Sequence, residues 1–125
     1  MVARAINDRV IYANRADIPS LKKKALELAE TRVEYFAARY GVSFGAISIG
    51  AQKSRWGSCS ADGELRFNYK IALLPQRLAD YVVVHELCHR LQFDHSKKFW
   101  AHVSVEIPEH KKLRKELRET NICFS

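Results

Sequence analysis

Apolar residues recur at intervals of about three to four positions between Leu21 and Tyr40, which is the spacing of one face of a helix. The positions on this face are Leu21, Ala25, Leu28, Ala29, Val33, Phe36, Ala37 and Tyr40. Pro19 suits the first turn of a helix, Asp17 or Ser20 can cap it, and Gly41 stands where helices commonly end. The pattern predicts an amphipathic helix from Pro19 to Tyr40.

After this helix the pattern changes to alternation. Apolar and polar residues alternate in Ala46–Ile49 and again in Glu64–Tyr69, as in strands that are buried on one face. The pair Asp62-Gly63, just before the second segment, is a turn signal. We expect two or three short strands here, forming a small antiparallel sheet. Val10–Tyr12 is a further short apolar run that fits a strand.

The second half of the chain predicts three helices. Pro75 opens a helix that continues to the region Leu91–Asp94, and the triplet Val82–Val84 makes it apolar on all sides, so we expect it to be central and buried. Asp94 or Ser96 can cap the next helix, and Pro108 ends that helix and starts the last one. The residues expected to face inward on these two helices are Phe99, Trp100, Val103, Ile107, Leu113 and Leu117.

Composition narrows the class of protein. The 125 residues carry a net charge of +7 and are 47% hydrophobic, which fits one α+β domain spanning residues 1–125. No apolar run approaches the ~20 residues of a membrane span. The odd number of cysteines, three, argues against a disulfide framework and for a reducing compartment. We therefore expect a cytoplasmic protein without a membrane segment.

The stretch His85-Glu86-Leu87-Cys88-His89 carries the most informative pattern. Residues four apart on a helix project from the same face, so both imidazoles can reach one zinc ion. Glu86, directly after the first histidine, would lie beside the metal, where a carboxylate can act as general base on a water molecule. The pattern predicts a Zn²⁺ site with Glu86 as the catalytic residue.

A catalytic zinc site normally has three protein ligands and one open position. His95 is the favoured third ligand, because it follows His89 by six residues and lies beyond the expected helix end, from where the chain can turn back over the metal. His102, Glu106 and Glu109 are the alternatives, since a downstream glutamate is the third ligand in another group of zinc enzymes.

Three blocks of the sequence resemble the YgjP-like zinc metallopeptidases, relatives of the SprT and WLM zincins. The blocks are Arg55-Trp56-Gly57-Ser58-Cys59-Ser60 with Leu65-Arg66-Phe67-Asn68, then Asp80 to His89, then His95-Ser96-Lys97-Lys98-Phe99-Trp100 with Ile107-Pro108. They occur in the right order and together cover about half of the chain, from Arg55 to Lys112. The first and last blocks make the resemblance much more specific than the histidine motif alone.

The resemblance implies a zincin-like minimal metallopeptidase fold: an N-terminal helix, a small antiparallel sheet, a central helix with the histidine motif, and two C-terminal helices. It implies zinc bound by His85, His89 and His95, with Glu86 as the catalytic base. It further implies hydrolysis of peptide bonds, with a peptide or protein as substrate, in a bacterial or archaeal cytoplasm.

A second hypothesis comes from the basic charge. Lysine and arginine cluster in Lys22–Lys24, Lys97–Lys98 and Lys111–Lys115, all on expected helices. Such clusters are usually solvated faces, but they also suit contact with nucleic acid. The chain would then be a nucleic-acid-associated module, either a protease that acts on DNA-bound proteins or an inactive binding relative.

Several further residues are candidates for supporting roles. Asn68 could hydrogen-bond a metal ligand or the loop at Arg55, and Trp56 and Trp100 are expected to be core residues rather than substrate platforms. Four side chains could stabilise an oxyanion, namely Arg55, Tyr69, Tyr81 and His110. A substrate peptide could pair with the strand at Glu64–Tyr69 or with Ile47–Ala51.

Overall fold

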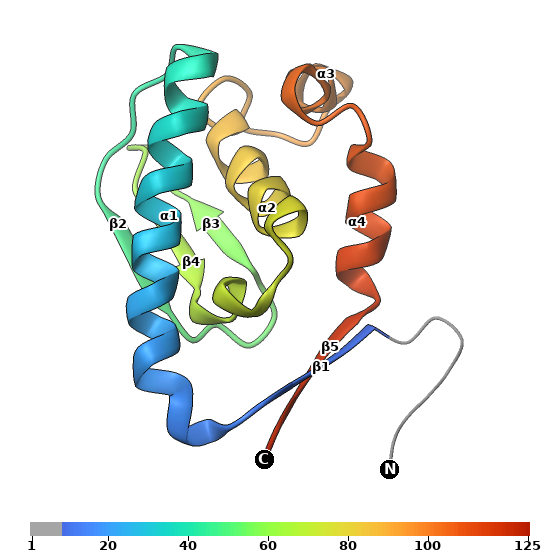
Figure 1. Cartoon of the computed structure of the whole chain (residues 1–125). Helices are drawn as coiled ribbons and strands as arrows, with labels where there is room; N and C mark the ends of the chain where they lie inside the picture. Colours follow the sequence, from blue (N-terminus) through green and yellow to red (C-terminus); the bar gives the residue numbers. More distant parts are fainter. Residues whose placement is uncertain (1–8) are drawn as a thin grey trace.

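The computed structural model describes residues 9–125, and its helices and strands are those of an α+β fold (Figure 1). In chain order they are β1 (Arg9–Ala13), the 3₁₀ turn η1 (Arg15–Asp17), α1 (Ile18–Tyr40), β2 (Ile47–Gly50), β3 (Gly57–Cys59), β4 (Leu65–Asn68), the 3₁₀ turn η2 (Tyr69–Leu73), α2 (Gln76–Cys88), α3 (Lys97–Glu106), α4 (His110–Arg118) and β5 (Thr120–Phe124). Figure 1 shows α2 between α1 and α4, with α3 across one end of the molecule. No helix within residues 9–125 is long and apolar enough to cross a membrane.

Helix α1 confirms the expected amphipathic helix. It begins at Ile18 and ends at Tyr40, and Gly41 follows it in the left-handed conformation with φ of 68°, which glycine adopts without a steric penalty. Asp17 precedes the helix, but its side chain makes no capping hydrogen bond. The buried residues of α1 are Leu21, Ala25, Ala29, Val33, Phe36 and Ala37, all from the predicted face.

The sheet contains the expected strands but is mixed rather than antiparallel. Its strand order is β2-β4-β3, with β4 in the centre. β3 runs antiparallel to β4, as predicted, whereas β2 pairs with β4 in parallel, Ile47 beside Leu65. The prediction was wrong for β2. The chain reverses direction between β2 and β3 and again between β3 and β4, so β2 and β4 run the same way. Alternation of apolar residues reports burial and carries no information on strand direction.

A second, separate pair of strands joins the two ends of the described chain. β1 confirms the strand expected at Val10–Tyr12, and it pairs in parallel with β5, with Tyr12 beside Cys123. β5 was not anticipated, although its residues alternate between half-buried and exposed positions. β5 directly follows α4, so its pairing with β1 fixes the C-terminal end of that helix (Figure 1).

Helix α2 is central and buried, as its sequence predicts. It contacts α1, α3, α4 and β3, and its Val82–Val84 triplet is 0–3% exposed. The helix ends at Cys88, earlier than the expected region Leu91–Asp94, because the chain tightens at His89 into a short turn. Arg90 stabilises this turn by donating hydrogen bonds to the carbonyls of Ser43 and Ala61, each at 3.0 Å.

The last two helices also follow the prediction. Ser96 precedes α3, and the carboxylate of Asp94 rather than the Ser96 hydroxyl accepts a backbone hydrogen bond there. Phe99 and Val103 are fully buried, whereas Trp100 packs against the core but stays half-exposed. Trp56 is likewise partly buried and packs against the core, so both tryptophans contact the core as expected, although neither is fully buried.

Asn68, at the end of β4, anchors the loop that precedes β3. Its amide nitrogen donates to the carbonyls of Gln52 at 2.7 Å and Arg55 at 3.2 Å, and its amide oxygen accepts from the backbone of Lys70 at 2.9 Å. Asn68 is 4% exposed, so these partners satisfy its polar atoms inside the protein. Of the two roles considered for Asn68, the loop contact is the one the structure contains.

We predict that Asn68→Ala lowers the free energy of unfolding by about 1–3 kcal/mol, because it removes buried hydrogen bonds and leaves backbone carbonyls without a donor. Chemical denaturation monitored by circular dichroism measures the change. Ser54→Ala, an exposed position in the same loop, is the matched control and should change stability by less than about 0.5 kcal/mol. Equal effects of the two substitutions would contradict the anchoring role.

Candidate metal centre

Three imidazoles meet at the exposed end of α2. His85, His89 and His95 each offer one nitrogen, and these three atoms lie within 4.8 Å of one another. They are the only such group of histidine, cysteine, aspartate and glutamate side chains within residues 9–125. The sequence spacing therefore brings together the three residues that it singled out.

Local structure explains how each imidazole reaches this point. His85 lies in the last turn of α2, and His89 directly follows the helix with helical backbone angles, so the two rings, four residues apart, share one face. His95 lies in the short loop between α2 and α3. Asp94 orders that loop, because its carboxylate accepts from the Gln92 amide at 2.9 Å and from the backbone of Ser96 at 3.3 Å.

Phe99 forms an apolar floor beneath the three rings. The centroid of its ring lies 5.0 Å from His85, 4.5 Å from His89 and 4.9 Å from His95. The side chain is 0% exposed, so it limits how far the imidazoles can move inward. The helical pattern marked Phe99 as a core residue, and only the folded structure shows that its ring faces the three histidines.

The ring nitrogens are arranged as ligands to a common ion would be. The Nε2 atoms of His85 and His95 face each other at 3.2 Å. The Nδ1 atom of His89 donates to the carbonyl of Gln92 at 3.3 Å, which leaves Nε2 of that ring as the free lone pair. Three imidazoles fit a divalent ion such as Zn²⁺, which takes nitrogen ligands in a tetrahedral set with one open position.

The surroundings of His85 and His89 favour the neutral form of the imidazole, the form that binds metals. Burial lowers the pKa of His85 to about 3, and the nearby His89 and His95 add to the effect. Burial also lowers the pKa of His89. Positive charge on His85 and His89 is therefore disfavoured, while the lone pairs of these two rings stay available.

Glu86 lies beside the three imidazoles at the base of a cleft. It is 8% exposed, and Gly57 of β3 packs closely against it, so that a Cβ atom at position 57 would lie 3.1 Å from the Glu86 Cγ. Burial raises the pKa of its carboxyl to about 7, an effect that the charge of Arg55 opposes. A carboxyl with a pKa near neutrality can both take up and release a proton at neutral pH.

The alternative third ligands lie elsewhere. Glu106 forms an ion pair with Arg39 of α1 at 2.5 Å, and the backbone carbonyl of His102 accepts a hydrogen bond from Tyr40 at 2.7 Å. Glu109 is exposed just before α4. None of the three belongs to the histidine group within the described residues.

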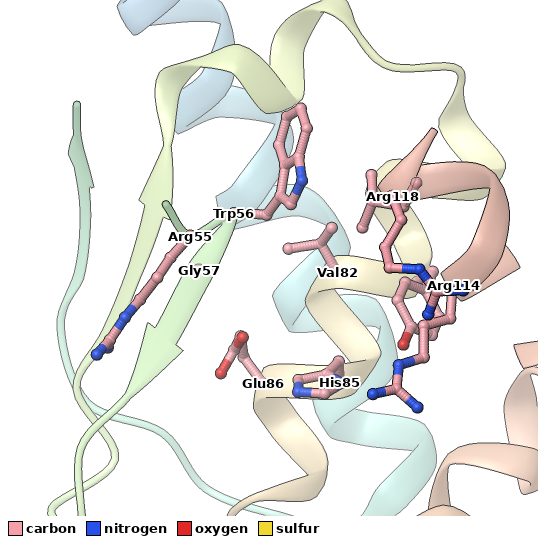
Figure 2. Close-up of a pocket in the computed structure, with 10 residues that line it drawn as sticks. Arg55, Trp56, Gly57, Val82, His85, Glu86, Arg114 and Arg118 are labelled. Carbon is pink, nitrogen blue, oxygen red and sulfur yellow. The ribbon is translucent and has the colours of Figure 1, made fainter. Parts of the chain in front are cut away.

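Two hollows meet at His85 and Glu86. One, of about 350 Å³, contains all three imidazoles and is bordered by β3 from Gly57 to Cys59. The other, of about 250 Å³, lies between β3, α2 and α4 (Figure 2). Residues that border both hollows are Arg55, Gly57, His85 and Glu86. A peptide that crosses the three imidazoles would therefore pass from one hollow into the other.

The four oxyanion candidates are placed differently. Arg55 borders both hollows and Tyr81 borders the smaller one, with its ring 5.9 Å from His85. Tyr69 is 7% exposed and faces Phe124 of β5. His110 stacks on Trp100 with the ring centroids 5.2 Å apart. Arg55 and Tyr81 are thus the two that stand beside Glu86.

The basic clusters lie on separate parts of the surface. Lys97, Lys111 and Arg114 border a groove of about 490 Å³ beside His95, between α3 and α4. The first turns of α1, where Lys22–Lys24 are exposed, lie at the opposite end of the molecule from α3 (Figure 1). One continuous basic face through both clusters is therefore absent from the described residues.

Comparison with known proteins now identifies the class. The family model of the YgjP-like metallopeptidase domain matches residues 13–120, so the chain belongs to the YgjP-like metallopeptidases. The resemblance seen in the sequence is confirmed, and it extends over more of the chain than the blocks from Arg55 to Lys112. A search of curated proteins gives no match.

Solved structures with a similar fold include two metallopeptidase zymogens. The metallopeptidase zymogen abylysin of Pyrococcus abyssi is 20% identical with a TM-score of 0.67, over 76% of this chain and 99% of its own. The metallopeptidase zymogen jannalysin of Methanocaldococcus jannaschii is 19% identical with a TM-score of 0.64, over 73% and 94%. Wss1 of Saccharomyces cerevisiae is 15% identical with a TM-score of 0.57, over 87% and 94%. The zincin-like α+β fold is thereby confirmed.

Sequence reasoning missed two residues beside the candidate centre. Arg114 and Arg118 extend from α4 toward the face of α2 that carries His85 (Figure 2). In the sequence they belong to a basic helix and look like solvated charges. Their spacing of four residues places them on one helix face, but only the packing of α4 against α2 decides what that face borders.

Proposed function

We propose that the chain is a zinc-dependent peptidase in which His85, His89 and His95 bind the metal and Glu86 is the general base. The observation that carries the proposal is the convergence of three imidazole nitrogens within 4.8 Å, beside a buried carboxylate at the base of an open cleft. This arrangement combines the ligand set of a catalytic zinc with a proton acceptor in its neighbourhood.

The chemistry divides between the metal and the protein. Zinc, when bound, supplies a Lewis acid that acidifies water and polarises a carbonyl group. Glu86 then accepts a proton from the attacking water and later delivers that proton to the amine nitrogen as the peptide bond breaks. The close packing of Gly57 and the burial of Glu86 hold the carboxylate in one place through both transfers.

The edge of the sheet offers a place for the substrate backbone. β4 is central and paired on both sides, so the prediction that a peptide joins the strand Glu64–Tyr69 is wrong. β2 and β3 are the two edges, and β3 is the edge that borders the cleft with the imidazoles. We therefore place an extended substrate along β3, where its backbone can form strand-like hydrogen bonds.

We predict that Glu86→Gln retains stoichiometric zinc but loses peptide hydrolysis by roughly 10²–10⁴-fold, because an amide cannot accept the proton. His85→Ala should lose both zinc and activity, since it removes a ligand. Metal content by mass spectrometry and cleavage of a quenched fluorescent peptide pool measure the two effects. Full activity of Glu86→Gln would rule out the proposed base, and purified protein with no affinity for zinc would rule out the metal site.

The third ligand has its own test. We predict that His95→Ala loses tight zinc binding, whereas His102→Ala, Glu106→Gln and Glu109→Gln retain it. Zinc should raise the melting temperature of the wild type and of these three variants, because a ligand that binds only the folded state stabilises it. His95→Ala should show little shift at the same zinc concentration. Loss of the shift in one of the other three variants, with His95→Ala unaffected, would reassign the ligand.

Nucleic-acid binding stays a prediction. One structural observation favours it, the basic groove beside His95. Binding through lysine and arginine should weaken steeply as salt concentration rises, since counterions are released. We expect fluorescence anisotropy with a labelled DNA duplex at low salt to detect such binding, and Lys97→Gln with Lys111→Gln to weaken it. Absence of binding at low salt would remove this second function.

A further inference from the structure

The smaller hollow beside Glu86 has apolar walls. Trp56, Val82 and Leu117 border it between β3, α2 and α4 (Figure 2). Its volume of about 250 Å³ is enough for a side chain or a short chain end rather than a folded segment. We call this hollow the α4 pocket, because α4 provides the residues that distinguish it.

Two arginines without acidic partners border the α4 pocket. Arg114 and Arg118 lie one turn apart on α4, and neither has an ion pair among the described residues. Three other arginines do have acidic partners, namely Arg32 with Asp80, Arg39 with Glu106 and Arg77 with Glu116. An arginine pair on an apolar pocket offers fixed hydrogen-bond donors to a carboxylate.

Arg114 is an exposed residue that contacts one aromatic ring. Its guanidinium carbon lies 5.1 Å from the ring centroid of Trp100, a cation–π contact that restrains the side chain. Arg114 also borders the same hollow as His85. Arg55, by contrast, turns its guanidinium away from the α4 pocket (Figure 2).

The α4 pocket is continuous with the proposed active site. His85 and Glu86 form part of its wall as well as part of the cleft that contains the imidazoles. A substrate whose scissile carbonyl lies at the metal would therefore place a neighbouring residue in the α4 pocket. Its apolar walls accept the carbon chain of that residue, and its arginines accept a negative end.

We propose that the α4 pocket selects substrates with a carboxylate next to the scissile bond, recognised by Arg114 and Arg118. The carboxylate can come from an aspartate or glutamate side chain or from the C-terminus of the peptide. The proposal rests on the peptidase function above and adds the substrate class.

The first experiment distinguishes the two sources. Zinc-loaded full-length protein is incubated with a peptide library that has free C-termini and with the same library after C-terminal amidation, and cleavage sites are read by mass spectrometry. Enrichment of aspartate or glutamate beside the cleaved bond in both libraries supports side-chain recognition. Cleavage near the C-terminus that disappears on amidation supports recognition of the chain end. Cleavage without either preference overturns the proposal.

The second experiment tests the arginines. The double variant Arg114→Gln with Arg118→Gln should lower kcat/KM for a glutamate-containing peptide by roughly tenfold or more, the size of a charge-assisted hydrogen bond. The matching glutamine peptide should change by less than about twofold. Lys112→Gln with Lys115→Gln removes the same charge from the same helix outside the α4 pocket and should leave the preference intact. An equal loss on both peptides, or the same effect from the lysine control, overturns the proposal.

A binding measurement separates this inference from the peptidase function. Calorimetry on Glu86→Gln protein should show tighter binding of the glutamate peptide than of the glutamine peptide, and Arg114→Gln with Arg118→Gln in that background should abolish the difference. Such a result supports the pocket even if the wild type hydrolyses neither peptide. Hydrolysis of both peptides at equal rates, with equal affinities, overturns the pocket and leaves the peptidase function standing.

Discussion

The burial of α2 is the constraint on which the rest of the structure depends. This helix is packed by α1, α3, α4 and β3, and its apolar residues are almost wholly inaccessible. Burial of large apolar side chains is the main favourable contribution to folding, at about 25 cal/mol per Å². It also costs free energy to place polar groups in that environment without partners. The imidazoles and Glu86 are therefore confined to the one end of the helix that opens to the cleft.

The walls around α2 are fixed by polar contacts as well as by packing. Arg32 of α1 binds Asp80 at two points, 2.7 and 3.0 Å, one turn before His85. Arg77 of α2 pairs with Glu116 of α4. These pairs set the orientation of the neighbouring helices more than they add stability, because partly exposed ion pairs contribute little net free energy. The position of α4 then determines which of its side chains border the site.

The two hollows differ in their lining. The cleft with the imidazoles is bordered by the edge strand β3, while the α4 pocket has apolar walls and two arginines. Glu86 and His85 belong to both. Of the positive charge that gives the chain its net +7, Arg114 and Arg118 lie at the α4 pocket, and neither has an ion pair among the described residues. Other basic residues, such as Lys22–Lys24 at the far end of α1, border neither hollow.

The sequence alone determined every helix, the strands β1, β2 and β4, and the residues that converge at the candidate metal centre. Helical and strand periodicities are local properties, and a spacing of four residues on one helix fixes where His85 and His89 point. The match of residues 13–120 to the family confirms the resemblance read from those motifs.

The tertiary structure decided what depends on partners distant in the chain. It set the parallel pairing of β2 with β4, the pairing of β5 with β1, and the end of α2 at Cys88, where Arg90 bonds to two distant loops. It also placed the Phe99 ring against the histidines, and it placed Arg114 and Arg118 of the basic helix α4 at the same hollow as Glu86. Periodicity shows which face of an element is buried. The packing of distant segments decides which groups that face will meet.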